Sequence, residues 1–160
     1  MLRAVQRDDI DKLVQLGKDT GIFGPGEADD LLGKTIVDLL DAKLPSGHQA
    51  HVLQDDVNVL GWMYFGPTED DPNVWNLWWI GVDPKYQGKG YGKNLLHFFE
   101  ATATKACAKE VMIETSSAPL LERTRAFYTQ QGYCVSRTEP DAYGPGEAKV
   151  LFTKAVNSRV

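Results

Sequence analysis

Residues 82–93 read VDPKYQGKGYGK and lie between an apolar, strand-like run and an amphipathic, helix-like segment. Glycine occupies every second position from 88 to 92, and lysine stands beside this repeat. Glycine lets the main chain turn sharply and bring its N–H groups close to a ligand. The first turn of a helix also presents unpaired N–H donors and a partial positive charge. The segment therefore predicts an anion site, and a pyrophosphate is the anion it suits best.

Other glycine-rich motifs fit this segment less well. A P-loop requires G-x-x-x-x-G-K-[ST], but Asn94 follows Lys93. A dinucleotide fingerprint requires G-x-G-x-x-G, and counted from Gly88 its third glycine is replaced by Lys93. Glu114, about 20 residues further on, keeps this interpretation open. A glycine-rich turn that binds no ligand is the third alternative.

The rest of the chain alternates between strand and helix patterns. Runs with strand character are 2–6, 49–54, 57–65, 74–82, 110–115, 133–138 and 149–156. Helical spacing covers a segment capped by Asp8 or Asp9 and ending near Lys18, then 27–43, the glycine loop to about Cys107, and 120–131. Loops are expected at 21–26, 66–73 and 139–147. This order predicts one α/β domain over residues 1–160, with a mixed sheet and helices on both faces.

Three local features carry specific expectations. Gly81 inside a strand suggests a bulge or a close approach of another backbone. Gly132 suits the position just after a helix. The helix after the glycine loop is expected to bury a stripe made of Gly92, Leu95, Leu96, Phe99, Ala103 and Ala106.

Composition narrows the possible functions. The 160 residues carry a net charge of −5, which argues against a nucleic-acid partner bound through a broad basic surface. No run of 18 apolar residues and no secretory signal pattern occurs, so neither a membrane span nor export is expected. Cys107 and Cys134 form no Cys/His cluster, so no metal site is expected. Two free thiols suit the cytoplasm.

Two motifs resemble the GNAT family of N-acetyltransferases. Gln87-x-x-Gly90-x-Gly92 matches its [QR]-x-x-G-x-[GA] signature, after a strand that ends in Val82-Asp83-Pro84. Further on, Phe127-Tyr128 followed by Gly132-Tyr133 matches a later family element in the expected order and spacing. The resemblance spans residues 2–156 and is specific over 74–133. It implies a GNAT-like fold, with a mixed, mostly antiparallel sheet of about seven strands, and transfer of an acetyl group from acetyl-CoA.

The resemblance also implies the residues that bind acetyl-CoA. Main-chain N–H groups of the loop would hold the pyrophosphate, and its residues are Gln87, Gly88, Lys89, Gly90, Tyr91, Gly92 and Lys93. Main-chain groups near Ile80 and Val82 would bind the pantetheine arm and polarise the acetyl carbonyl. Leu121 stands where relatives often carry an Asn that contacts this arm, so Ser116, Ser117 or Thr124 is expected to substitute. The alternative for the lysines is a solvated helix start.

For catalysis, the resemblance implies that Tyr128 protonates the leaving CoA thiolate. Its alternative role is that of a core tyrosine. Relatives often place a Glu that acts as the general base on the strand before the signature. This chain has Asn76 there and no acidic residue from 74 to 80. Glu114 is the nearest strand-borne acid and is the candidate general base. A capping or salt-bridged carboxylate is its alternative.

The acceptor amine is the least determined part. Trp78 and Tyr64 are candidates for the wall of an acceptor pocket, and Tyr143 lies in a loop that could cover it. Small-molecule and peptide amines remain open as acceptors, and so does a homodimer. The alternatives to an N-acetyltransferase are an enzyme that uses another acyl-CoA or transfers to oxygen, and a CoA-binding sensor without activity.

Overall fold

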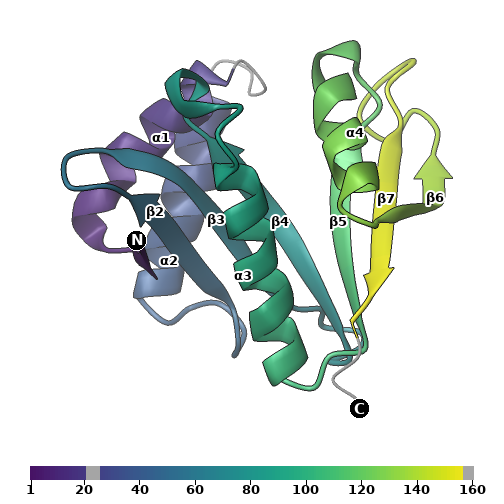
Figure 1. The fold of residues 1–160 in the computed structure, drawn as a ribbon, viewed down its shortest axis with the longest axis horizontal. Helices are drawn as coiled ribbons and strands as arrows, with labels where there is room; N and C mark the ends of the chain where they lie inside the picture. Colours follow the sequence, from purple (N-terminus) through teal and green to yellow (C-terminus); the bar gives the residue numbers. More distant parts are fainter. Residues whose placement is uncertain (21–25, 157–160) are drawn as a thin grey trace. The chain divides into compact units, whose positions relative to one another are not determined.

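The computed structural model describes residues 1–20 and 26–156 (Figure 1). The loop expected at 21–26 therefore lies outside the described residues except for Gly26. The chain forms two compact units, one of Met1–Gly66 with Trp79–Phe98 and the other of Pro67–Trp78 with the chain from Phe99 onward. Three elements, the strands from Val59 and Val74 and the helix from Tyr91, begin in one unit and end in the other.

Seven strands form one sheet in the order β1-β2-β3-β4-β5-β7-β6. Their bounds are β1 (Leu2–Ala4), β2 (Gln49–Gln54), β3 (Val59–Pro67), β4 (Val74–Val82), β5 (Glu110–Ser116), β6 (Cys134–Glu139) and β7 (Lys149–Ala155). The β4–β5 pair is parallel, whereas β1–β2, β2–β3, β5–β7 and β6–β7 are antiparallel. The mixed, mostly antiparallel sheet expected from the sequence is confirmed, and each strand begins and ends within two residues of its expected bounds.

The longer helices are α1 (Ile10–Asp19), α2 (Lys34–Leu40), α3 (Tyr91–Lys105) and α4 (Glu122–Gln130). A short helical segment precedes each of them: η1 (Arg7–Asp9), η3 (Pro84–Tyr86) and η4 (Pro119–Leu121) are 3-10 turns, and η2 (Ala28–Gly33) is a π-helical segment. The helix expected over 27–43 is found as η2 followed directly by α2, and it ends three residues early, at Leu40. Ala42 has a φ of +58°, and Lys43 N–H donates to the Asp38 carbonyl at 2.8 Å, which ends α2 early.

The same type of ending closes α3 and α4. After α3, Cys107 takes a φ of +67°, Ala108 N–H donates to the Ala103 carbonyl and Cys107 N–H to the Thr104 carbonyl, each at 2.9 Å. After α4, Gly132 takes a φ of +95°, as its expected position after a helix requires. The expected extension of α3 to Cys107 is wrong by two residues, because Cys107 already has the left-handed conformation that ends the helix.

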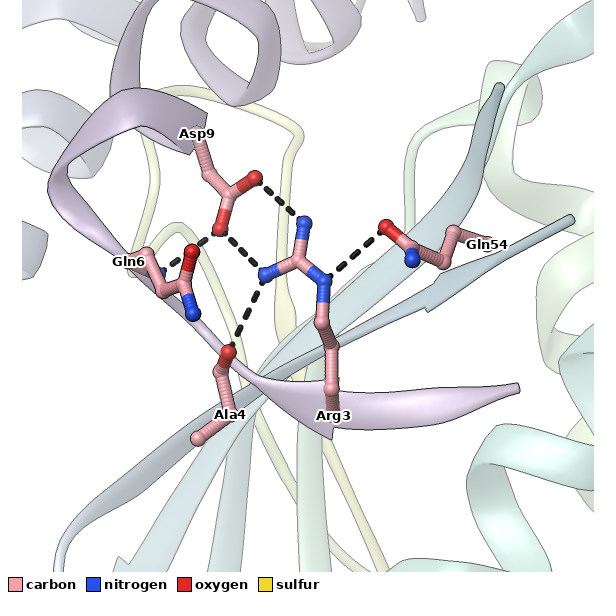
Figure 2. A network of polar contacts seen from close by, with 5 residues as sticks. All are labelled: Arg3, Ala4, Gln6, Asp9 and Gln54. Carbon is pink, nitrogen blue, oxygen red and sulfur yellow. Dashed lines mark hydrogen bonds and ion pairs between the residues drawn. The ribbon is translucent and has the colours of Figure 1, made fainter. Parts of the chain in front are cut away.

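In the first unit, one arginine ties three elements together (Figure 2). Arg3 of β1 makes two hydrogen bonds to the Asp9 carboxylate, at 2.8 and 2.7 Å, and a third from its Nε to Gln54 Oε1 of β2 at 2.9 Å. Gln6 N–H also donates to Asp9, at 2.7 Å. Of the two expected capping residues, Asp9 stands at the N-cap position of α1, but its carboxylate makes no cap hydrogen bond there and points to Arg3 instead.

Close packing in the first unit depends on small residues. A Cβ on Gly61 of β3 would lie 2.7 Å from the Gly81 carbonyl oxygen of β4 and 3.1 Å from Leu95 of α3. The close approach expected at Gly81 therefore exists, and the residue opposite it is also glycine. Of the predicted α3 stripe, Leu95, Leu96, Phe99 and Ala103 are buried. Gly92 is only half-buried, and Ala106 is exposed because it lies beyond the end of the helix.

The second unit packs α4 against β7 (Figure 1). The Tyr128 ring meets the Phe152 ring edge-on, with 5.6 Å between centroids. Beside it, the Tyr133 hydroxyl donates to Glu100 Oε2 of α3 at 2.8 Å, and Lys154 Nζ donates to Glu100 Oε1 at 3.1 Å. This network satisfies the polar groups that β7 and the end of α4 bring into the core.

Candidate functional site

The glycine loop between η3 and α3 is open to a ligand on the side of its glycines. Gly88 and Gly90 have φ values of +81° and +87°, a region that side chains disfavour. A Cβ at either position would meet no atom within 4 Å, so nothing in the described protein fills this side of the loop. The Gly90 carbonyl accepts from Asn94 N–H at 3.1 Å, which begins α3 directly after the loop.

A buried aspartate, Asp83, holds the start of the loop in place. Asp83 is 6% exposed, and its N–H donates to the Leu60 carbonyl of β3 at 2.8 Å. Its carboxylate accepts from Lys85 N–H at 3.0 Å, and its carbonyl accepts from Tyr86 N–H at 2.8 Å. The sequence interpretation used Asp83 only as part of a motif. Its position before Pro84, where aspartate caps a helical turn, was the signal for this role.

Charge and donor groups at the loop suit an anion. The first N–H groups of α3, from Tyr91 onward, have no partner within the helix and point out of its N-terminus. Lys89 and Lys93 are exposed beside them. Gln87 Nε2 donates to the Val82 carbonyl at 3.3 Å, which ties the loop to the end of β4. The loop therefore has the donors, the space and the charge that a pyrophosphate requires.

The end of β4 lies beyond its parallel pairing. The β4–β5 register joins Val74–Leu77 to Glu110–Ile113 and ends there. Ile80 and Val82, the residues expected to bind a pantetheine arm, follow that point and are half-buried. Their main-chain groups on that edge of β4 take no part in this register.

In the first unit, Tyr64 belongs to an aromatic cluster. Its ring faces Trp79 of β4 at 5.5 Å, and its hydroxyl bonds to His48 Nδ1. Burial raises the pKa of Tyr64 to about 12, so the phenol is neutral at physiological pH. Trp78, the other residue predicted from the sequence to line the acceptor pocket, belongs to the second unit and is half-buried. Tyr64 is thus more deeply buried than a pocket wall needs.

In the second unit, Tyr128 is 3% exposed and its ring packs between Tyr133 and Phe152. Its hydroxyl makes no hydrogen bond to any other residue in the described part of the chain. Burial raises the pKa of Tyr128 well above its ordinary value, so the phenol keeps its proton. A neutral, unpartnered hydroxyl can donate a proton to a stronger base.

Glu114, at the end of β5, lies in a small polar group on the second unit. Its carboxylate lies close enough to the Tyr143 hydroxyl to affect the pKa of that phenol. Lys149 Nζ lies 3.8 Å from Glu114 Oε1 and 3.7 Å from Glu139 Oε2, so it attracts both carboxylates without a hydrogen bond to either. Burial, and then Glu114, raise the pKa of Tyr143. The structure therefore brings Glu114 and Tyr143 together, and it adds Lys149, which the sequence interpretation missed.

The hydroxyls expected to replace the missing Asn have other partners. Ser116 donates to Glu147 Oε2 at 2.6 Å, and Ser117 accepts from Ala148 N–H at 2.8 Å. Both bonds hold the loop before β7 to the end of β5. Thr124 on α4 is half-buried and is the hydroxyl of this set that remains a candidate.

Asn76 presents an unpaired group inside the sheet. It is 3% exposed, and its Oδ1 has no hydrogen-bond partner in the described residues. The sequence drew attention to this position only because it lacks an acid. No sequence signal shows that a buried amide oxygen will lack a partner.

In the described part of the chain, no three His, Cys, Asp or Glu side chains gather as a metal site would require. Over the same residues, no helix has the length and apolar character to cross a membrane.

Comparison with solved structures shows the same fold across the whole chain. A protein from Desulfovibrio desulfuricans assigned to the GNAT family is 25% identical, with a TM-score of 0.91 over 98% of this chain and 99% of that one. The ribosomal-protein-S18-alanine N-acetyltransferase of Escherichia coli is 14% identical, with a TM-score of 0.77 over 100% and 96%. A Salmonella typhimurium structure with acetyl-CoA as its cofactor is 14% identical, with a TM-score of 0.73 over 100% and 95%.

A comparison with curated protein sequences found no match. The model of the acetyltransferase (GNAT) family matches residues 23–133, which is more than half of the chain. The resemblance seen in the two sequence motifs is thereby confirmed. This chain belongs to the GNAT family of acetyltransferases.

Proposed function

We propose that this protein is an acetyl-CoA-dependent N-acetyltransferase that moves an acetyl group to a primary amine by direct attack. The observation that carries the proposal is the glycine loop, with two positive-φ glycines and open space over both, at the start of α3 in a GNAT chain. The Salmonella relative was solved with acetyl-CoA. Both compact units, residues 1–160, act as one catalytic domain in this proposal.

Binding of acetyl-CoA is assigned to the residues expected from the sequence. Main-chain N–H groups from Gly88 to Lys93 hold the pyrophosphate, with added charge from Lys89 and Lys93. Main-chain groups of Ile80 and Val82 and the hydroxyl of Thr124 bind the pantetheine arm. Gln87 contributes by tying the loop to β4.

The transfer breaks the C–S bond of the thioester and forms a C–N bond. The amine arrives as an ammonium, because an alkyl amine has a pKa near 10.4, and freeing it at pH 7 costs about 4–5 kcal/mol. Glu114 takes that proton and passes it to solvent. The second amine proton also reaches solvent as the amide forms. Tyr128 gives its proton to the CoA thiolate and regains one from solvent, so one free proton is released overall.

The acceptor enters against the second unit in this proposal, with Tyr143 covering it and Trp78 as the candidate wall. Neither free cysteine is needed, since the amine attacks the thioester directly. We place the protein in the cytoplasm because its two exposed free thiols suit a reducing compartment. A homodimer is compatible with this scheme but is not required by it.

A thiol-release assay tests the function. Acetyl-CoA is mixed with the protein and a panel of primary amines, including alkyl amines, diamines, aminoglycosides and peptides with a free N-terminus, and free CoA is measured. We expect release that depends on both the protein and an amine. Tight acetyl-CoA binding with no release for any amine would instead support a sensor, and release with propionyl-CoA alone would support another acyl donor.

A further inference from the structure

Asn76 is a buried polar residue whose amide oxygen has nothing to bond to. It lies near the middle of β4, 3% exposed, and its Oδ1 has no partner in the described residues. Removing an amide oxygen from water without a replacement hydrogen bond destabilises a fold. Because most buried polar groups are paired, such an oxygen requires an explanation, and a ligand donor is one.

The strand register places Asn76 next to Glu114. Asn76 pairs with Met112 of β5, and Glu114 lies two residues further along the same strand, so all three side chains leave the sheet on the same face. Diagonal neighbours of this kind are about 7–8 Å apart at their Cα atoms, within reach of long side chains. The pairing ends at Leu77 and Ile113, so Glu114 is the first residue of this face beyond the paired region.

Glu114 has capacity for further hydrogen bonds. Its side chain is 34% exposed, and Lys149 at 3.8 Å is too far for a hydrogen bond. A carboxylate offers about four hydrogen-bond acceptor positions, so acceptors remain for another donor.

We infer that Asn76 Oδ1 and the Glu114 carboxylate together bind the N–H groups of the acceptor, and that Asn76 is the residue by which the site distinguishes a primary amine from a secondary one. This inference rests on the proposed function and adds a specificity-determining residue to it. A neutral primary amine has two N–H groups, one for each oxygen, and its lone pair stays free to attack. A neutral secondary amine has one N–H and an alcohol has one O–H, so each leaves one of these two acceptors unpaired.

Asn76 acts on specificity, not on proton transfer. Its amide oxygen gains and loses no proton during the reaction, whereas Glu114 takes the proton of the ammonium. A site built to accept an N–H discriminates strongly against a substrate that lacks it, because the protein oxygen then remains unpaired. Asn76 is therefore the residue that selects primary amines.

The test uses Asn76→Leu with Thr153→Val as its matched control. Thr153 pairs with Met112 from β7, so it lies on the same face as Asn76 and also exchanges a polar group for an apolar one. The probes are n-butylamine and N-methylbutylamine with saturating acetyl-CoA. We expect Asn76→Leu to lower kcat/KM for n-butylamine about 30–100-fold and for N-methylbutylamine less than 5-fold, with the KM for acetyl-CoA within 2-fold. Thr153→Val should change kcat/KM for neither amine.

The stability of Asn76→Leu is a second readout, and it should change in the direction opposite to its activity. Because Asn76→Leu removes an unpaired buried oxygen, its urea midpoint should equal or exceed that of the wild type. A lower midpoint with an unchanged preference for n-butylamine would overturn the inference and make Asn76 a structural residue. If the wild type transfers acetyl to no amine of the panel, the proposed function itself fails. If the wild type is active, the comparison of Asn76→Leu with Thr153→Val tests the inference alone.

A binding measurement covers the case in which Asn76→Leu does not fold. The side-chain amide resonances of Asn76 are followed by NMR in the wild-type protein with CoA while n-butylammonium chloride is added. We expect a saturable shift that trimethylammonium chloride, which has only one N–H, does not reproduce. No shift with n-butylammonium would overturn the inference.

Discussion

Two buried polar groups, one in each compact unit, differ in how they are satisfied. Asp9 in the first unit accepts two hydrogen bonds from Arg3 and one from Gln6 N–H. Asn76 in the second unit is as deeply buried, but its amide oxygen accepts none from the described residues. The first arrangement stabilises the fold and leaves nothing for a ligand. The second costs stability and keeps an acceptor ready for one.

The same contrast separates two tyrosines five residues apart. Tyr133 donates its hydroxyl to Glu100 at 2.8 Å, whereas the Tyr128 hydroxyl has no partner in the described chain. Both phenols are buried and neutral, since burial raises the pKa of each. If unpaired groups mark the site and paired groups hold the fold, removing one hydroxyl or the other should affect different properties.

The largest expected effect is that of Tyr128→Phe. We expect kcat to fall by about 10²–10⁴-fold, the usual contribution of a general acid, with acetyl-CoA affinity within 3-fold and little change in stability. Tyr133→Phe is the matched variant: it removes a hydrogen bond to a carboxylate and should cost about 1–2 kcal/mol of unfolding free energy, with kcat nearly unchanged. Thiol-release kinetics and urea unfolding measure both. Equal kcat values for the wild type and Tyr128→Phe would remove Tyr128 from the acid role.

The glycine loop extends the contrast to main-chain groups, because the first N–H donors of α3 are also unpaired within the helix. Gly90→Val forces a β-branched residue to adopt a φ of +87°, so the loop must change shape. We expect CoA affinity, measured by calorimetry, to fall about 10–100-fold while the fold stays intact, since a Cβ at Gly90 meets no atom within 4 Å.

Gly144→Val is the control for this prediction. Gly144 has a φ of +133° and equally open space, but it lies in the loop before β7. Its substitution introduces similar backbone strain and should leave CoA affinity within 2-fold. Wild-type affinity in Gly90→Val would show that this turn does not hold the pyrophosphate.

These differences explain which parts the sequence could predict. The glycine loop, the strands and Gly132 depend on residues adjacent in the chain, so local patterns revealed them. The partner of Glu114 comes from a distant segment, because Lys149 reaches it from β7, and Arg3 reaches Asp9 from another element six residues away. The missing partner of Asn76 Oδ1 depends on every side chain packed around it. No local pattern contains that information.

The next effect is expected at Asp9, the buried polar group whose hydrogen bonds are satisfied. Asp9→Asn leaves the Arg3 guanidinium without its charged partner and should cost about 1–3 kcal/mol, between the values for buried and exposed pairs, since Arg3 is partly exposed. Kinetic constants should stay unchanged. Asp38→Asn, which breaks the exposed Lys34–Asp38 pair, should cost no more than about 0.5 kcal/mol and serves as the control.

Acid should remove this contribution in a defined direction. Hydrogen bonds from Arg3 lower the pKa of Asp9 below its ordinary value of about 3.9, so the unfolded chain binds the proton first. The Asp9 contribution is complete above about pH 4 and is lost as the pH falls through the folded-state pKa. Urea unfolding from pH 7 to pH 2 should therefore show the wild type and Asp9→Asn converging at low pH. A constant difference would contradict the ion pair.

The smallest effect is expected at Cys107, where the main-chain hydrogen bonds that end the helix are made but the backbone is strained. Cys107 and Gly132 end their helices with the same pair of main-chain hydrogen bonds, but only Gly132 adopts a positive φ without cost. Cys107→Gly should therefore stabilise the protein by about 0.5–1 kcal/mol, with some of the relief offset by the greater freedom of glycine in the unfolded chain. Gly132→Ala should destabilise it by a similar amount. Kinetics should be unaffected by either change, because both helix ends already satisfy their carbonyls. A loss of stability in Cys107→Gly would show that the thiol makes a contribution larger than the strain.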